Sequence, residues 1–382
     1  MMSKRYLIKL TPTGKYFFGG DIKFSVENND KKDNKEKDNK EKDNSKSSYI
    51  VESAQMPQQT SLLGMMRFLL LSNNKELFDI NKNKIIDNAG EKVKQLIGEK
   101  SFTVNEQSEE NKFGKIKSLG PCFIYHNEKC YSKSPLDNSL SVDFDNIQKA
   151  VVNGIEVEIP LLKKSNGDSY TGKDYLDTCF VAIDNIEGSD FIKEDKENPI
   201  FKKDTRIGID KNYEGKTKDS AFYKQISYRL RKDCAFAFEV EVDKDIDLKK
   251  YNGKLVKLGA DSSMFIFEAE EKQPNKIIQG DGLAVVLLSN AYIDITKDCK
   301  PRYAITKTIP FRFLTTEVKQ DSSYYRINGK DTPATTGCRY ELYESGSVFY
   351  FGSKAERETF CDALENRKDF NQIGYNKYYI KK

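Results

Sequence analysis

The strict alternation of apolar and polar side chains over residues 222–242 constrains the fold more than any other feature. Even positions are mostly aromatic or aliphatic, and odd positions are mostly polar or charged. Because successive side chains of a strand point to opposite faces of a sheet, this alternation predicts two half-buried strands. Lys232 and Asp233 interrupt the apolar pattern and predict a tight turn between those strands. The apolar run 283–288 adds a central strand.

Two segments carry helix signals. Thr60 and Ser61 are candidate N-caps of a helix that runs to about Ser72 and carries a buried stripe of Leu and Met. Ser353 and Glu356 have the spacing of a capping box that opens a second helix. Strands and helices therefore mix without the regular alternation that a doubly wound sheet needs. We expect an α+β fold with antiparallel sheets and few helices.

Weakly patterned segments divide the chain of 382 residues, a length that suits two domains. Residues 30–46 contain the repeat DNKEKDNKEKDN and no apolar residue, so we predict a disordered insertion there. Residues 163–220 are rich in Lys, Asp, Gly and Asn, which predicts a protruding loop or hairpin. We therefore expect an N-terminal unit over 1–162, this insertion, and a C-terminal unit over 221–382.

Several function classes are excluded by what the sequence lacks. The seven cysteines include no C-x-x-C pair, so neither a disulfide framework nor a metal site is predicted. There is no P-loop, dinucleotide fingerprint, H-E-x-x-H or G-x-S-x-G motif, so no cofactor is predicted. The longest apolar-rich run, residues 62–71, is about half the length that spans a bilayer. A cytoplasmic protein without membrane attachment is the expectation.

His126 is the single histidine and the one candidate for a general base, the role that histidine commonly takes in RNA cleavage. The sequence offers no second histidine and no fixed carboxylate partner for it. A structural role for His126 is therefore favoured, and binding is favoured over catalysis.

Signals for nucleic acid are local, because the net charge of +4 is too small to indicate RNA by itself. Cations interleaved with aromatic residues gather in the segment 202–232. Such cations can contact phosphates, and aromatic rings can stack on unpaired bases. The segment also contains acidic residues, so composition alone favours an ordinary charged surface over an RNA-binding one.

Glycines and one helix face add to this hypothesis. Gly19 and Gly20, and Gly259 before Asp261, would permit close approach of the backbone to a phosphate or ribose, although tight turns explain them equally well. On the first predicted helix, small and cationic residues form a second stripe away from the Leu/Met stripe. A helix N-terminus with a nearby cation suits a phosphate. The members of that stripe are Thr60, Gly64 and Arg67.

Five segments, in order along the chain, resemble the RAMP superfamily of CRISPR proteins, and in particular the third subunit of the Cmr (type III-B) effector complex. They are residues 11–20, residues 56–67, residues 120–135, residues 206–223, and residues 258–261 together with 346–350. One departure concerns the glycine-rich loop, where Ala260 stands in place of the family's second glycine.

The resemblance implies two ferredoxin-like (RRM-like) units and a non-catalytic protein that binds the repeat-derived 5′ tag of a guide RNA in antiviral defence. The implied partners are the large polymerase-like subunit and the backbone RAMP subunits. The implied RNA-binding residues are Gly19, Gly20, Thr60, Gly64, Arg67, Arg206, Gly259 and Asp261. Electrostatics adds Lys211, Lys218, Arg229 and Arg231.

Two alternatives stay open. The first is a guide-RNA-processing endoribonuclease of the same superfamily, in which His126 would be the general base. The second is the equivalent 5′-tag-binding subunit of another CRISPR type.

Overall fold

The computed structural model describes residues 3–19, 22–26, 47–105, 107–138, 140–152, 155–164, 167–168, 179–186, 190–192, 197–211, 217–273, 277, 279–293, 300–318 and 339–382. These residues form an α+β fold with mostly antiparallel sheets and few helices, as the sequence predicts. None of the helices in the described ranges is long and apolar enough to cross a membrane. The predicted insertion 30–46 lies outside the described residues.

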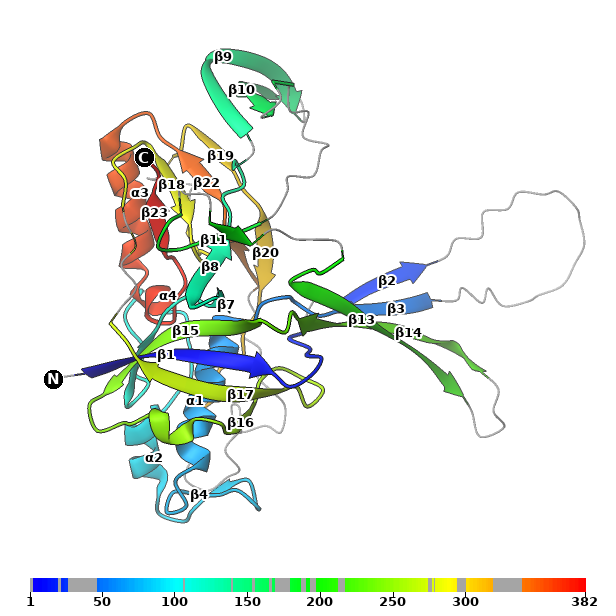
Figure 1. Ribbon diagram of the computed structural model, residues 1–382, viewed down its shortest axis with the longest axis vertical. Helices are drawn as coiled ribbons and strands as arrows, with labels where there is room; N and C mark the ends of the chain where they lie inside the picture. Colours follow the sequence, from blue (N-terminus) through cyan, green and yellow to red (C-terminus); the bar gives the residue numbers. More distant parts are fainter. Residues whose placement is uncertain are drawn as a thin grey trace, which may run out of the picture.

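The largest sheet is built around β1 (Ser3–Pro12), which pairs antiparallel with β15 (Cys234–Asp243) on one side and with β17 (Met264–Glu271) on the other. The strand order is β12-β11-β8-β7-β15-β1-β17-β16, and β6 also pairs with β15. The remaining strands are β6 (Ile116–Leu119), β7 (Phe123–His126), β8 (Lys129–Lys133), β11 (Phe180–Ala182), β12 (Phe191–Ile192) and β16 (Leu255–Lys257). We call this the central sheet (Figure 1).

One face of the central sheet is buried in the main hydrophobic core. Ile8 of β1, Phe236 of β15 and Phe267 of β17 belong to this core, together with Leu62 and Met66 of α1 (Gln59–Ser72). On β15, the inward-facing side chains are at the even positions, as the alternation over 222–242 predicts. Close to α1 lie α2 (Gly90–Ile97), the short hairpin of β4 (Phe78–Asp79) and β5 (Lys84–Ile85), and the 3-10 turn η1 (Lys249–Tyr251).

A second sheet projects from the central sheet (Figure 1), and we call it the arm. Its order is β13-β14-β3-β2, and all its pairs are antiparallel except β14 with β3. Its strands are β2 (Ile22–Val26), β3 (Ser47–Glu52), β13 (Phe201–Lys211) and β14 (Thr217–Leu230). Strands β13 and β14 form a hairpin. The projection predicted over 163–220 thus contains β13 and the start of β14, and β14 continues into the region 222–242, where the sequence predicts strands. Another projecting hairpin consists of β9 (Leu140–Val152) and β10 (Ile155–Lys164).

The two strands predicted over 222–242 and the turn at Lys232 and Asp233 are confirmed. The two strands do not pair with one another, however, because β14 belongs to the arm and β15 to the central sheet. Both edges of β15 are occupied, by β1 on one side and by β6 and β7 on the other. The alternation reports which face each side chain takes, and it carries no information about the partner strand.

A third sheet has the order β19-β22-β18-β23 and carries helix α3 (Lys354–Asn366). Its strands are β18 (Ala284–Leu287), β19 (Tyr303–Ile305), β22 (Val348–Tyr350) and β23 (Tyr378–Ile380). Val285, Phe349 and Phe360 form a separate small core between this sheet and α3. The remaining elements are α4 (Lys368–Gln372) and the hairpin of β20 (Thr308–Phe311) and β21 (Tyr340–Tyr343).

The two helix starts differ in their caps. The capping box of α3 is confirmed: the amide of Glu356 donates to the Ser353 hydroxyl at 3.3 Å, and the amide of Ser353 donates to the Glu356 carboxylate at 3.2 Å. The prediction of Thr60 and Ser61 as N-caps of α1 is wrong, because the N-cap is Gln58 and it forms no side-chain cap. At the first residue of the helix, the buried Gln59 side chain donates to two distant carbonyls, those of Gly120 (2.7 Å) and Ile373 (2.8 Å).

These caps lead to a stability prediction. Ser353→Ala removes a side-chain acceptor at a helix N-terminus and is expected to lower the free energy of unfolding by about 1 kcal/mol. Ser61→Ala is the matched control, since its exposed side chain caps no helix, and we expect a change below about 0.5 kcal/mol. Chemical denaturation of both variants measures the difference, and equal effects would refute a stabilising role for the capping box.

Candidate nucleic-acid interface

Four segments far apart in the sequence meet where the arm joins the central sheet: residues 16–19, 53–54, 225–228 and 258–263. We call this place the loop junction. Backbone hydrogen bonds hold it together: the amide of Tyr16 donates to the Tyr228 carbonyl (2.8 Å), that of Ala54 to Gly19 (3.0 Å), and that of Ala260 to Phe17 (2.8 Å). Two sequence-predicted site regions, around Gly19 and around Gly259 and Asp261, are thus brought together.

The glycines of the loop junction serve the protein's own backbone. Gly259 has a φ of +86°, and a Cβ added there would lie 2.4 Å from the carbonyl oxygen of Phe17. Gly19 has a φ of +69° with open space around it, so only its conformation requires glycine. Asp261 accepts a hydrogen bond from the Gln225 side chain. The close backbone approach at Gly259 is therefore an approach to Phe17, and it fixes the loop against the start of the arm.

The arm carries a row of polar and cationic side chains on one face, which we call the arm face. Residues directly opposite one another in a strand pair share a face, and the register pairs Lys202 with Arg229 and Arg206 with Gln225. The guanidinium of Arg229 donates to the Asp204 carboxylate at 2.9 Å. Arg206 is exposed and forms no ion pair with another described residue. Its charge is therefore available to an anion.

Asp204 sits among these cations. The hydrogen bond from Arg229, reinforced by Lys15 at 3.3 Å, holds the pKa of the Asp204 carboxyl below its usual range. The carboxylate remains charged at neutral pH and partly neutralises Arg229 and Lys15. A phosphate that binds Arg229 has to compete with Asp204, whereas Arg206 forms no ion pair with another described residue.

Tyr223 completes the arm face, although it is absent from the residues predicted from motifs. It lies opposite Gly208 in the register, and a Cβ added at Gly208 would lie 2.0 Å from its Cζ atom. The ring therefore covers the glycine while its side chain stays 36% exposed. Tyr228, in contrast, is buried as predicted, and its hydroxyl donates to the Glu52 carboxylate at 2.7 Å. An exposed aromatic ring beside Arg206 can stack on an unpaired base.

The other predicted cations fall in different places. The guanidinium of Arg231 is mostly buried at the turn after the arm and donates to Asp233 at 2.7 Å. Lys211 lies near the end of β13 and Lys218 near the start of β14, toward the far end of the hairpin. The predicted residue Gly20 lies outside the described residues.

Helix α1 places its second stripe differently from the expectation. Thr60 and Gly64 are partly exposed, whereas Arg67 is only 1% exposed. The Arg67 guanidinium donates to the carbonyl of Ile97 at 2.8 Å, to that of Gly98 at 3.2 Å and to the Thr316 hydroxyl at 2.9 Å. The first two acceptors lie at the C-terminal end of α2, where a cation is favourable.

The position of Arg67 along α1 separates it from the helix N-terminus. A rise of 1.5 Å per residue puts Arg67 roughly 12 Å from the start of the helix. One phosphate cannot contact both, so the proposed pairing of helix N-terminus and nearby cation does not describe this helix. A contact between Arg67 and RNA would first require breaking its bonds to α2.

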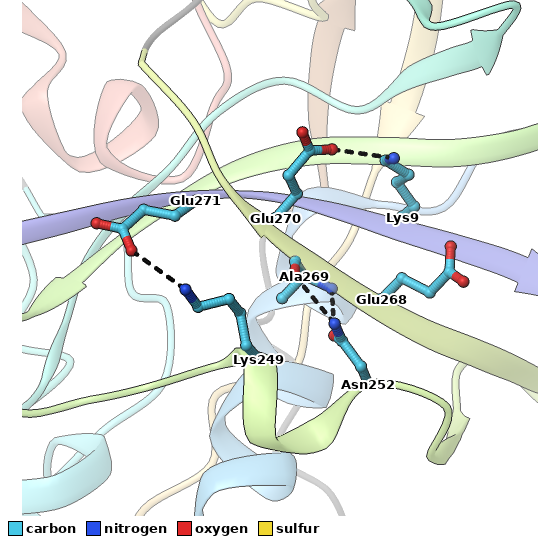
Figure 2. Close-up of a pocket in the computed structure, with 7 residues that line it drawn as sticks. All are labelled: Lys9, Lys249, Asn252, Glu268, Ala269, Glu270 and Glu271. Atoms are coloured by element: carbon cyan, nitrogen blue, oxygen red, sulfur yellow. Dashed lines mark hydrogen bonds and ion pairs between the residues drawn. The ribbon is translucent and has the colours of Figure 1, made fainter.

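The opposite face of the central sheet has another chemical character (Figure 2). Lys9 and Glu268 are opposite one another in β1 and β17, between neighbours that point into the core. They line a shallow depression of about 470 Å³ that holds three carboxylates against two ammonium groups and no aromatic ring. Lys9 pairs with Glu270 at 3.1 Å and Lys249 with Glu271 at 3.6 Å. The described residues that line the depression thus offer no ring of the kind with which RRM-type sheets stack on bases.

His126 has a carboxylate neighbour that the sequence could not reveal. Its Nδ1 atom lies 3.3 Å from Oδ2 of Asp233 and 3.1 Å from the carbonyl oxygen of the same residue. The imidazole is 15% exposed at the end of β7. The histidine is thus fixed to the turn between β14 and β15.

The sequence profile of a family of CRISPR-associated proteins, Cas_Cmr3, matches residues 38–382 of this chain. The chain belongs to this family. The match confirms the resemblance to the third subunit of the Cmr (type III-B) effector complex that the sequence motifs indicate.

Two solved structures contain chains similar to this Cas_Cmr3 family member. One is described as "Cryo-EM structure of the Type III-B Cmr-beta bound to cognate target RNA and AMPPnP, state 1", with 13% identity, a TM-score of 0.46, and coverage of 98% of this chain and 96% of that chain. The other is "Cryo-EM structure of the Type III-B Cmr-beta bound to cognate target RNA", with 14% identity, a TM-score of 0.47, and coverage of 99% and 96%. No curated protein matches the sequence of this chain.

The burial of Arg67 leads to a prediction that separates packing from RNA contact. Arg67→Ala leaves the carbonyls of Ile97 and Gly98 without this donor, so we expect a loss of about 3 kcal/mol in the free energy of unfolding. Arg206→Ala is the matched surface control and should change it by less than about 0.5 kcal/mol. Denaturant titration measures both. An Arg67→Ala protein that keeps full stability and loses RNA affinity would restore a direct RNA contact.

Proposed function

We propose that this chain is a non-catalytic subunit of a type III-B (Cmr) effector complex that holds the repeat-derived 5′ tag of the guide RNA. The observation that carries the proposal is the arm face, where the exposed Arg206 stands next to the exposed ring of Tyr223. Single-stranded RNA is commonly bound by this combination, because cations follow the phosphates and aromatic rings stack on bases irrespective of sequence.

The arrangement along the arm supports a strand-like ligand. Lys202 and Arg206 are four residues apart on one face of β13, which corresponds to about 13 Å along the strand. Tyr223 continues the row toward the far end of the hairpin, and Arg229 lies opposite Lys202 toward the root. An extended RNA backbone lying along this row would meet several cations and one ring. The loop junction, with Gly19, Gly259 and Asp261, would bound the site at the root of the arm.

We also propose that the chain contains two ferredoxin-like units that follow one another along the sequence. A ferredoxin-like β-α-β-β-α-β unit has the spatial strand order 4-1-3-2. Strands β17, β1, β15 and β7 follow this order, with α1 between β1 and β7 and only η1 before β17. Strands β23, β18, β22 and β19 follow it again, with α3 before β23. We propose this division, with β1 to β17 in the first unit and β18 to β23 in the second, as an alternative to the predicted boundaries at 162 and 221.

The partners follow from the family. We propose that the chain contacts the large polymerase-like subunit and the backbone RAMP subunits in the cytoplasm, using surfaces other than the arm face. The carboxylate-rich surface of β1 and β17 (Figure 2) supports this separation, since carboxylates repel RNA phosphates and tolerate a protein neighbour.

Two arm variants of the full chain test the RNA site. Arg206→Ala removes one phosphate contact, so the slope of log affinity against log salt should fall by about 0.7. Tyr223→Ala removes one stacked base and should cost about 1–3 kcal/mol of binding with the slope unchanged. Fluorescence anisotropy with single-stranded RNA of the repeat tag, titrated at several salt concentrations, measures both quantities.

Lys249→Ala provides the control for charge alone, because Lys249 lies beside the carboxylate-rich depression. Its removal should leave the salt slope unchanged. Equal losses for Arg206→Ala and Lys249→Ala would mean that RNA binds through overall charge and would reject the arm face.

One observation favours a second candidate, the guide-RNA-processing endoribonuclease. The contact between His126 and the Asp233 carboxylate orients an imidazole in the way that a general base requires. We expect the purified chain to leave repeat RNA intact, as a non-catalytic subunit would. Cleavage by the wild-type chain that disappears in His126→Ala, followed on a denaturing gel, would instead establish the nuclease.

A further inference from the structure

Three metal-ligating side chains of different chemistry converge where the arm joins the central sheet. His126 of β7 and Cys234 of β15 are directly opposite one another in an antiparallel pair, so their side chains share a face. Asp233 precedes Cys234 in the turn. The imidazole nitrogen, the thiol sulfur and a carboxylate oxygen of these residues all lie within 4.8 Å of one another. We call this group the root cluster.

We propose that the root cluster binds a zinc ion or a similar thiophilic divalent cation. Imidazole, thiolate and carboxylate together are a typical donor set for zinc, and softer metals are selected by the sulfur. With metal–ligand bonds of about 2.0–2.3 Å, tetrahedral donors lie about 3.5 Å apart. The distances to the carboxylate oxygens of Asp233, 3.3 Å from His126 Nδ1 and 3.5 Å from Cys234 Sγ, already match this separation.

The electrostatics of the root cluster are compatible with the cation. Arg231 donates to Oδ1 of Asp233 at 2.7 Å, while Oδ2 faces His126. The carboxylate can therefore keep its bond to Arg231 through one oxygen and ligate the metal through the other. A thiolate and a carboxylate cancel the two charges of the ion. The guanidinium then remains as a neighbour that favours the thiolate form of Cys234.

Metal binding would change the protonation of Cys234. Burial raises the pKa of this thiol to about 11, although Arg231 partly opposes the shift. Without metal the sulfur therefore carries its proton at neutral pH. A bound zinc ion displaces that proton to solvent as the metal–sulfur bond forms. A tetrahedral zinc ion held by these three ligands would have one position left for water.

The location suggests what the ion would do. His126 belongs to the central sheet, whereas Asp233 lies in the turn that follows the last arm strand. One ion bound to both would tie the root of the arm to β7. This inference does not depend on RNA binding. It also opposes the nuclease alternative, because an imidazole nitrogen that ligates a metal cannot accept a proton.

Metal titration of the full apo chain tests the proposal. Cobalt(II) serves as a spectroscopic probe, since a thiolate ligand adds a sulfur-to-metal charge-transfer band, and zinc binding is measured by calorimetry. We expect one equivalent of metal per chain. Cys234→Ser should lose the charge-transfer band and bind zinc at least about 10-fold more weakly. Cys361→Ser is the matched control, a buried thiol outside the root cluster, and should bind as the wild type does.

Asp233→Asn keeps the test decisive if Cys234→Ser fails to fold, because Asp233 is exposed. It should also weaken zinc binding by at least about 10-fold. The proposal is overturned if the wild-type chain binds no stoichiometric metal, if the charge-transfer band persists in Cys234→Ser, or if Asp233→Asn binds zinc with unchanged affinity.

Discussion

The pairing of β1 with two strands from the second half of the chain is the interaction on which the rest of the structure depends. Tyr6 lies opposite Val240 on one side and opposite Glu271 on the other. These contacts close loops of more than two hundred residues, and long-range pairing of this kind is typical of slowly folding proteins. Once they form, the buried face of β1 provides the surface on which α1 and the main core assemble.

The arm takes its position from the same pairing. Its strand β14 continues into β15, and Tyr16, just after β1, bonds back to Tyr228 of β14. The loop after β16 then reaches Phe17 through Ala260. Cations and an exposed ring lie on the arm, whereas carboxylates gather over β1 and β17. The modest net charge of the whole chain conceals this separation, which is why composition alone favours an ordinary charged surface over an RNA-binding one.

The sequence predicts features that depend on neighbouring residues, but it does not predict which distant residues come into contact. The alternation over 222–242, the turn at Lys232 and the capping box at Ser353 each depend on neighbours in sequence, and all three are confirmed. The expectation that Arg67 lies on an accessible face of α1 differs from the structure, where Arg67 is buried against α2. Helical periodicity shows which residues share a face of a helix, but it does not show which element packs on that face. The carboxylate beside His126 comes from Asp233, 107 residues away. No spacing rule connects residues that only a strand pairing brings together.

The short turn between β14 and β15 has a consequence for the cost of binding. Only residues 231–233 separate the end of β14, in the arm, from the start of β15, in the central sheet. A flexible arm would lose conformational entropy when it closes on a ligand, and that loss would weaken affinity. An arm held at its root by a three-residue turn and by the loop junction has already lost most of that freedom during folding. Binding on the arm then avoids the part of the entropic cost that comes from ordering the protein.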